Sequence, residues 1–240
     1  MEQLADRLAQ VPGVVAVALV GSRALGEERP ESDWDFCLYY RKRLEVEPLR
    51  ALGEGEVAEP GAFGPVLDGA ARLIVSGQRV DILYRDLTAA ERWLEEAREG
   101  RFEIAHAPGL VAGFPTYALA AELALGKVLL GELPRPEFPE ALKEAAPGRW
   151  RGQAAIALDA AETVAQRVNV SACAGLLARA ALAEAQGRHA ERGEWVAGER
   201  GILRRAGLGE ADIILAMPGA DPFELERSAR RMRLALGIRG

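Results

Sequence analysis

Short apolar runs separated by Gly- and Pro-containing breaks characterise the chain up to residue 86. Runs rich in β-branched and aromatic residues predict strands, whereas apolar residues at a spacing of three and four predict helices. Strands are predicted at residues 14–20, 33–40, 71–75 and 79–84. Helices are predicted at residues 2–10, 22–25, 45–52 and 86–98, with Asp86 as the N-cap of the last. The Gly- and Pro-rich stretch 53–69 is predicted to be a loop, with room for short strands near Val57 and Val66.

From residue 115 onward the pattern is helical. Helices are predicted at residues 116–130, 140–146, 150–167, 171–186, 194–205 and 223–236. The predicted helix stops are Gly131, Pro147-Gly148, Gly187 and Gly207. Mixed strands and helices followed by helices alone indicate two packed units. We therefore expect an α/β domain at residues 1–110 and an all-α helical bundle at residues 115–240.

Three aspartates lie within the strand-like runs: Asp33, Asp35 and Asp81. An unpaired charge in a buried strand costs several kcal/mol, so these carboxylates need a chemical reason. Side chains alternate along a strand, which places Asp33 and Asp35 on one face, about 7 Å apart. This spacing suits two Mg²⁺ ions about 4 Å apart. The pattern therefore predicts a divalent metal site for phosphoryl-type chemistry.

The order of these residues resembles the signature of the DNA polymerase beta-like nucleotidyltransferase superfamily. Gly21-Ser22 follows the apolar run 14–20 directly, ten residues intervene, and Asp33-Trp34-Asp35 comes next, with Asp81 in a later strand. The resemblance is most specific over the first 85 residues. The remainder resembles, more loosely, the antibiotic-modifying members, which append a helical domain. The resemblance implies an α/β (α+β) nucleotidyltransferase domain with a small mixed sheet, followed by an all-α domain.

The resemblance also implies roles for the aspartates. Asp33 and Asp35 would hold two Mg²⁺ ions, and Asp81 would hold the metal that activates the attacking hydroxyl. The co-substrate would be ATP or another nucleoside triphosphate, and the catalytic residues would be these three aspartates.

The turn after the first strand is the expected binding site for the triphosphate. Gly21 lets the backbone approach phosphates closely. Ser22 is expected to cap the following short helix and to bind a phosphate oxygen. Arg23 either adds charge to this site or is solvated. Glu122 is an alternative auxiliary base, by analogy with antibiotic nucleotidyltransferases, although a solvated helical glutamate is the favoured interpretation.

Composition limits the partners. The formal net charge is -6 and the pI is about 5.2, which argues against bulk nucleic acid as the main partner. The sequence has no apolar run long enough to predict a membrane span or a signal segment. The distant Cys37 and Cys173 predict free thiols in a reducing cytoplasm, with Cys37 a small core residue rather than a metal ligand.

The expected function is transfer of a nucleoside monophosphate to a hydroxyl of a small polar acceptor, with release of pyrophosphate. One alternative is a protein-modifying or antitoxin-type nucleotidyltransferase that acts on a protein partner. Another is a pseudoenzyme that binds nucleotide without turnover, which the intact set of three acids disfavours. The acceptor, the preferred base and a possible homodimer stay open.

Overall fold

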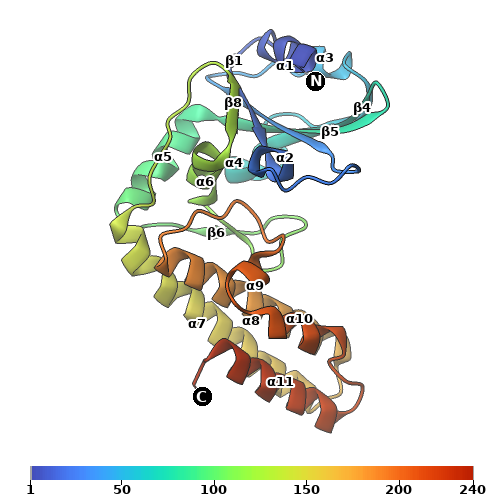
Figure 1. Cartoon of the computed structure of the whole chain (residues 1–240), viewed down its shortest axis with the longest axis vertical. Coiled ribbons are helices and arrows are strands. Elements are labelled where there is room, and N and C mark those ends of the chain that lie inside the picture. Colours follow the sequence, from blue (N-terminus) through green and yellow to red (C-terminus); the bar gives the residue numbers. More distant parts are fainter. Residues whose placement is uncertain (1, 240) are drawn as a thin grey trace. The chain divides into compact units, whose positions relative to one another are not determined.

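The computed structural model describes residues 2–239, which form two compact units (Figure 1). The first unit contains the residues up to Glu96 together with Thr116–Glu137. The second contains Ala97–Pro115 and the residues from Phe138 onward. Each unit is therefore built from two separate stretches of sequence.

Within residues 2–239, the first unit contains one six-stranded sheet in the order β3-β4-β5-β2-β1-β8. The strands are β1 (Val14–Val20), β2 (Trp34–Tyr40), β3 (Glu54–Val57), β4 (Gly69–Val75), β5 (Gln78–Asp86) and β8 (Lys127–Leu130). The helices are α1 (Glu2–Ala9), α2 (Gly21–Leu25), α3 (Glu47–Arg50), α4 (Gly64–Leu67), α5 (Leu87–Arg98) and α6 (Ala118–Leu125). Strands β2 and β5 are parallel, and the other neighbouring strands are antiparallel. This confirms the predicted small mixed sheet.

The main hydrophobic core of this unit lies on one face of the sheet. Phe36 and Leu38 of β2 and Ile82 of β5 alternate with residues that point to the other face, and all three are almost fully buried. Leu4 and Leu8 of α1 join the same cluster. Burial of each large apolar side chain stabilises the fold by about 1.5–3 kcal/mol. The core therefore anchors β2 and β5, the strands that carry Asp35 and Asp81.

The prediction of one helix at residues 116–130 is wrong. Helix α6 ends at Leu125, Gly126 is extended with ψ of 142°, and the chain continues as strand β8. Strand β8 pairs with the edge of β1, with Val128 opposite Ala18. Hydrogen bonding at a sheet edge thus overrides helix propensity there. The division into domains at residues 1–110 and 115–240 stays a prediction.

The second unit is mainly helical. Its elements are the strands β6 (Ile104–Ala105) and β7 (Phe114–Pro115) and the helices α7 (Glu140–Ala165), α8 (Val170–Glu191), α9 (Ile202–Arg205), α10 (Gly209–Ala216) and α11 (Pro222–Leu236). The predicted helix at 194–205 is wrong except for its last turn, and α10 was not predicted. Among the described residues, no helix is both long and apolar enough to span a bilayer.

Two predicted helix stops lie inside helices. Pro147 sits within α7, and α8 continues past Gly187. A Cβ atom at Gly187 would lie 3.3 Å from the Cβ of Trp150, so this glycine allows α7 and α8 to approach closely. Trp150 is fully buried at this contact. Here glycine serves helix packing, which a pattern of local stop signals does not distinguish from a helix end.

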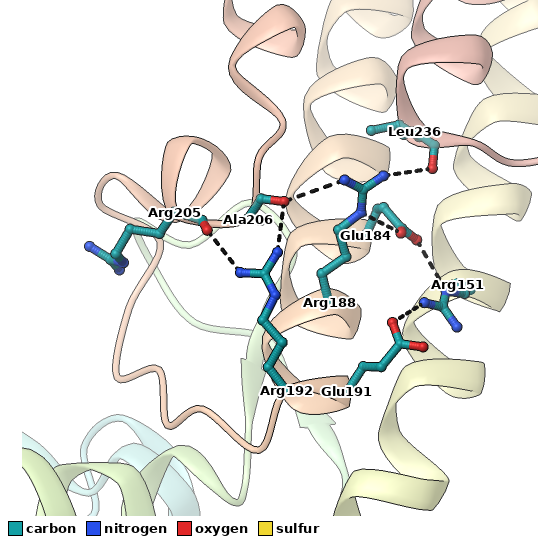
Figure 2. A network of polar contacts seen from close by, with 8 residues as sticks. All are labelled: Arg151, Glu184, Arg188, Glu191, Arg192, Arg205, Ala206 and Leu236. Atoms are coloured by element: carbon teal, nitrogen blue, oxygen red, sulfur yellow. Dashed lines mark hydrogen bonds and ion pairs between the residues drawn. The ribbon is translucent and has the colours of Figure 1, made fainter.

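A polar network ties the helices of the second unit together (Figure 2). The buried carboxylate of Glu184 accepts a hydrogen bond of 3.0 Å from Nε of Arg188 on the same helix. The other nitrogens of Arg188 donate to the carbonyls of Ala206 and Leu236, at the ends of α9 and α11. A cation near helix C-terminal carbonyls is favourable. Arg188 therefore links α8 to α9 and α11.

Candidate active site

A row of polar residues crosses one face of the sheet. Asp35 of β2 stands opposite Asp81 of the parallel strand β5. Asp81 stands opposite Arg72 of β4, and Arg72 opposite Glu56 of β3. Directly opposed residues on adjacent strands share a face, and such strands lie about 4.8 Å apart. The carboxylates of Asp35 and Asp81 are therefore neighbours, with a guanidinium on the next strand.

Arg72 is a site residue that the sequence analysis missed. Its side chain is exposed and lies on the face that carries Asp81. The available signal was the hairpin around Ser76-Gly77, which pairs the strand of Arg72 with that of Asp81. The pairing of Arg72 with Asp81 depends on the register of the hairpin, and that register can be predicted only when the turn geometry is known.

The pKa of Asp81 is raised above its ordinary value. Desolvation by burial is the largest cause; Arg72 opposes the shift by lowering the pKa, and the charge of Asp33 raises it further. The effect of Asp33 means that this carboxylate is close enough to repel Asp81. A divalent cation among the carboxylates would relieve that repulsion.

Arg23 holds the loop that presents Asp33. Its Nε donates to the carbonyl of Asp33 at 3.1 Å and its Nη2 to the carbonyl of Ser32 at 2.7 Å. Its guanidinium also lies 4.2 Å from the ring centroid of Trp34. The sequence predicted that Arg23 binds phosphate or is solvated, and it did not predict these contacts with the loop and with Trp34. Its contacts position Asp33, and a phosphate contact stays a prediction.

The Gly21 turn passes directly against a carboxylate. Gly21 has φ of +67°, and a Cβ atom there would lie 2.3 Å from Oδ2 of Asp35. Both the left-handed backbone and the lack of space call for glycine. The predicted capping role of Ser22 is wrong, because α2 begins at Gly21 with Val20 as its N-cap and no side-chain capping bond. Phosphate binding by Gly21 and Ser22 stays a prediction.

Replacement of Gly21 by alanine is expected to weaken nucleotide binding and to destabilise the first unit by more than about 1 kcal/mol, because the new methyl group displaces the Asp35 carboxylate. Gly26→Ala is the matched control, since Gly26 has φ of +69° and a Cβ atom there would meet no other atom within 4 Å. Urea unfolding and calorimetric nucleotide titration of both variants measure the difference. Equal effects of the two substitutions would mean that only backbone strain matters.

Replacement of Arg72 by glutamine is expected to raise the pKa of Asp81, because Arg72 lowers it in the native protein. The acid limb of the activity profile would move to higher pH, since the ionised form of Asp81 then appears only at higher pH. NMR titration of the Asp81 carboxyl carbon measures the pKa directly. Arg79→Gln, an exposed change on the same strand as Asp81, is the control. An unchanged or lower Asp81 pKa in Arg72→Gln would refute this electrostatic role.

Glu122 forms a buried ion pair with Arg85. The carboxylate oxygens accept bonds of 2.6 and 2.7 Å from the guanidinium, and both residues are at most 6% exposed. Burial acts to lower the pKa of Arg85, but the charge and hydrogen bonds of Glu122 raise it above its ordinary value. The prediction of a solvated Glu122 is therefore wrong. The pair links β5 to α6, and a role for Glu122 as auxiliary base stays a prediction.

Cys37 lies on the same face as Asp35 but is fully buried. Burial, followed by the charge of Glu122, raises the pKa of its thiol to about 12. A thiol of this kind is neither a nucleophile nor an accessible metal ligand at neutral pH. This confirms the expectation of a core cysteine.

The donor set suits a hard cation, because carboxylate oxygens are the preferred ligands of Mg²⁺. Asp33, Asp35 and Asp81 are each half-buried, and Asp35 and Asp81 are already paired in register. Among residues 2–239, no three His, Cys, Asp or Glu side chains converge into a metal-binding cluster. The paired strands supply two adjacent carboxylates, and the third, that of Asp33, lies on the loop before β2.

The mixed sheet, the Gly-Ser turn after β1 and the acids on the parallel strands β2 and β5 agree with the nucleotidyltransferase signature that the sequence resembles. The family model of the nucleotidyltransferase domain matches residues 1–93. Residues 1–93 are therefore similar to this domain family, which indicates a nucleotidyltransferase domain. A nucleotidyltransferase-like protein from Exiguobacterium sibiricum 255-15 is similar in structure, with 16% identity, a TM-score of 0.41, and coverage of 98% of this chain and 72% of that one. None of the curated proteins matches the chain.

Proposed function

We propose that the protein is a metal-dependent enzyme that transfers a nucleoside monophosphate from ATP or another nucleoside triphosphate to a hydroxyl group of a small polar acceptor. The pairing of Asp35 with Asp81 on adjacent strands carries this proposal. The Gly21 turn against the Asp35 carboxylate supports it, because a triphosphate bound there would reach a metal held by these acids.

Asp33, Asp35 and Asp81 would hold two Mg²⁺ ions. When bound, the ions would offset the charge of the triphosphate and lower the pKa of the acceptor hydroxyl. Asp81, whose own pKa is raised by burial, would help to take the hydroxyl proton. The acceptor oxygen forms a bond to the α-phosphorus, the bond from that phosphorus to the bridging oxygen breaks, and pyrophosphate leaves.

The backbone at Gly21 and the hydroxyl of Ser22 would contact the triphosphate. Arg23 would act mainly through the loop, since its guanidinium donates to the carbonyls of Ser32 and Asp33. Arg72, beside Asp81 and exposed, supplies a further positive charge on this face. A planar guanidinium suits phosphate oxygens well.

A small acceptor is favoured over a nucleic acid on grounds of charge. The net charge of -6 gives no general attraction for a polyanion, whereas a nucleotide needs only a local site.

Calorimetric titration with ATP, with and without Mg²⁺, tests the proposal on the wild type, on Asp33→Asn and on the exposed control Asp6→Asn. We expect binding that requires Mg²⁺, is lost in Asp33→Asn and is retained in Asp6→Asn. The other three ribonucleotides identify the preferred base. Binding by Asp33→Asn equal to that of the wild type would overturn the assignment of Asp33 to the metal site.

A further inference from the structure

A cavity of about 580 Å³ lies at the carboxyl ends of the parallel strands β2 and β5. It is lined by Tyr40 and Asp86 at the strand ends, by residues of the 61–68 segment and by the first turns of α5. All of these residues belong to the first unit. Ligands of sheets with parallel strands often bind beyond the carboxyl ends of the strands, and the volume is that of a small-molecule site.

Asp68 brings an unsatisfied carboxylate oxygen to this cavity. Its Oδ1 accepts a hydrogen bond of 2.7 Å from the backbone N–H of Gly61. Its Oδ2 is buried and has no hydrogen-bond partner in the part of the chain that the structure describes, and the residue is only 8% exposed. Burial, then a side-chain hydrogen bond with Asp68 and the charge of that carboxylate, raise the pKa of the Tyr40 hydroxyl, so the phenol lies beside the Asp68 carboxylate. An unpaired buried acceptor is costly and therefore calls for a donor.

The backbone of Asp68 is also strained. Its φ of 62° and ψ of -95° place a residue other than glycine in a sparsely populated region. Such strain costs about 1–3 kcal/mol and clusters at ligand-binding sites.

The other charges around the cavity leave it negative. The guanidinium of Arg85 is neutralised by Glu122. Asp86, half-buried, adds a second carboxylate, one oxygen of which accepts from the N–H of Thr88. Arg92 is exposed, and its guanidinium lies 4.7 Å from the ring centroid of Trp93.

Apolar atoms complete the walls. They come from Pro65, Val66, Ala89 and Leu119. We propose that this cavity is a second ligand site, which binds a small organic ammonium ion. Its N–H groups would donate to Oδ2 of Asp68, and its carbon skeleton would lie against these apolar residues.

This site is separate from the three aspartates. Asp81 and Asp86 are five residues apart on β5, which corresponds to about 16 Å along the strand. An amine in the cavity is therefore too far from the Asp35–Asp81 pair to be the group that receives the nucleotide. Its binding does not depend on the proposed transfer reaction.

Calorimetry and saturation-transfer NMR with cyclohexylamine, and with cyclohexanol as the uncharged match, test the proposal on the full chain. We expect cyclohexylamine to bind and cyclohexanol to bind at least about tenfold more weakly, because a charge-assisted hydrogen bond is lost. No binding of the amine up to about 10 mM would overturn the proposal and leave a cavity that holds water only. Equal binding of the alcohol would also overturn it.

Two variants locate the amine. Asp68→Asn keeps the acceptor for Gly61 and tolerates positive φ, but it replaces the carboxylate charge, so binding should weaken about tenfold to a hundredfold. Ala89→Leu fills the cavity without changing its charge and should also abolish binding. Asp212→Asn, an exposed change in the second unit, is the control and should bind as the wild type does. Circular dichroism verifies folding, and wild-type affinity in both Asp68→Asn and Ala89→Leu would place the amine elsewhere and refute the site.

Discussion

Replacement of Asp35 by asparagine is expected to lower nucleotidyl transfer about 10³-fold, because a metal ion supplies several kcal/mol of transition-state stabilisation. Asparagine keeps the shape of the side chain but loses its charge. Asp35 lies against the Gly21 turn and stands opposite Asp81 in the sheet, so it is the carboxylate next to both parts of the site. Release of pyrophosphate from each nucleoside triphosphate, with a panel of hydroxyl acceptors, measures the effect.

The fold of Asp35→Asn should stay intact, since the core lies on the other face of the sheet. Circular dichroism and thermal unfolding provide that control. Asp6→Asn, which removes an exposed carboxylate from α1, should keep the wild-type rate. A rate for Asp35→Asn within a few-fold of the wild type would show that this carboxylate does not hold the metal.

Replacement of Glu122 by glutamine is expected to destabilise the first unit by about 3–5 kcal/mol, because Arg85 is left as an uncompensated buried charge. The pair is almost fully buried, with Arg85 only 4% and Glu122 only 6% exposed. Urea unfolding, with hydrogen exchange of the β2 and β5 amides, assigns the loss to the sheet.

Glu47→Gln is the matched control in the same unit. Its carboxylate pairs with Arg50, but its side chain is 81% exposed, so the expected change is at most about 1 kcal/mol. The double variant Arg85→Met with Glu122→Leu should recover most of the stability, since an apolar pair carries no desolvation cost. Similar losses for Glu122→Gln and Glu47→Gln would show that the buried pair contributes no more than a surface pair.

The sheet that carries the site was predictable because short-range sequence patterns identify its strands. The run 14–20 coincides with β1, and the hairpin 71–84 contains most of β4 and β5. Asp86 is the predicted cap of α5, with its carboxylate accepting from the N–H of Thr88 at 2.9 Å. These features depend on residues near in sequence, where alternation and capping act.

Features that depend on distant contacts were missed. Lys127–Leu130 becomes a strand only because β1 offers an open edge, and Glu122 is buried only because Arg85 meets it from another strand. Gly187 was predicted to end a helix, but it lies within α8 and allows close packing against Trp150 of α7. In the candidate site, the three aspartates could be identified from the sequence pattern. The position of Arg72 beside Asp81 could not, because it depends on the register of the hairpin.

We propose that Asp35 and Asp81 bind a divalent metal together with a nucleoside triphosphate. Anomalous diffraction from crystals grown with Mn²⁺ and a non-hydrolysable triphosphate tests it most directly. We predict an anomalous peak within coordination distance of carboxylate oxygens of both Asp35 and Asp81, next to the triphosphate at the Gly21 turn. A bound nucleotide whose Mn²⁺ contacts neither aspartate would contradict the account.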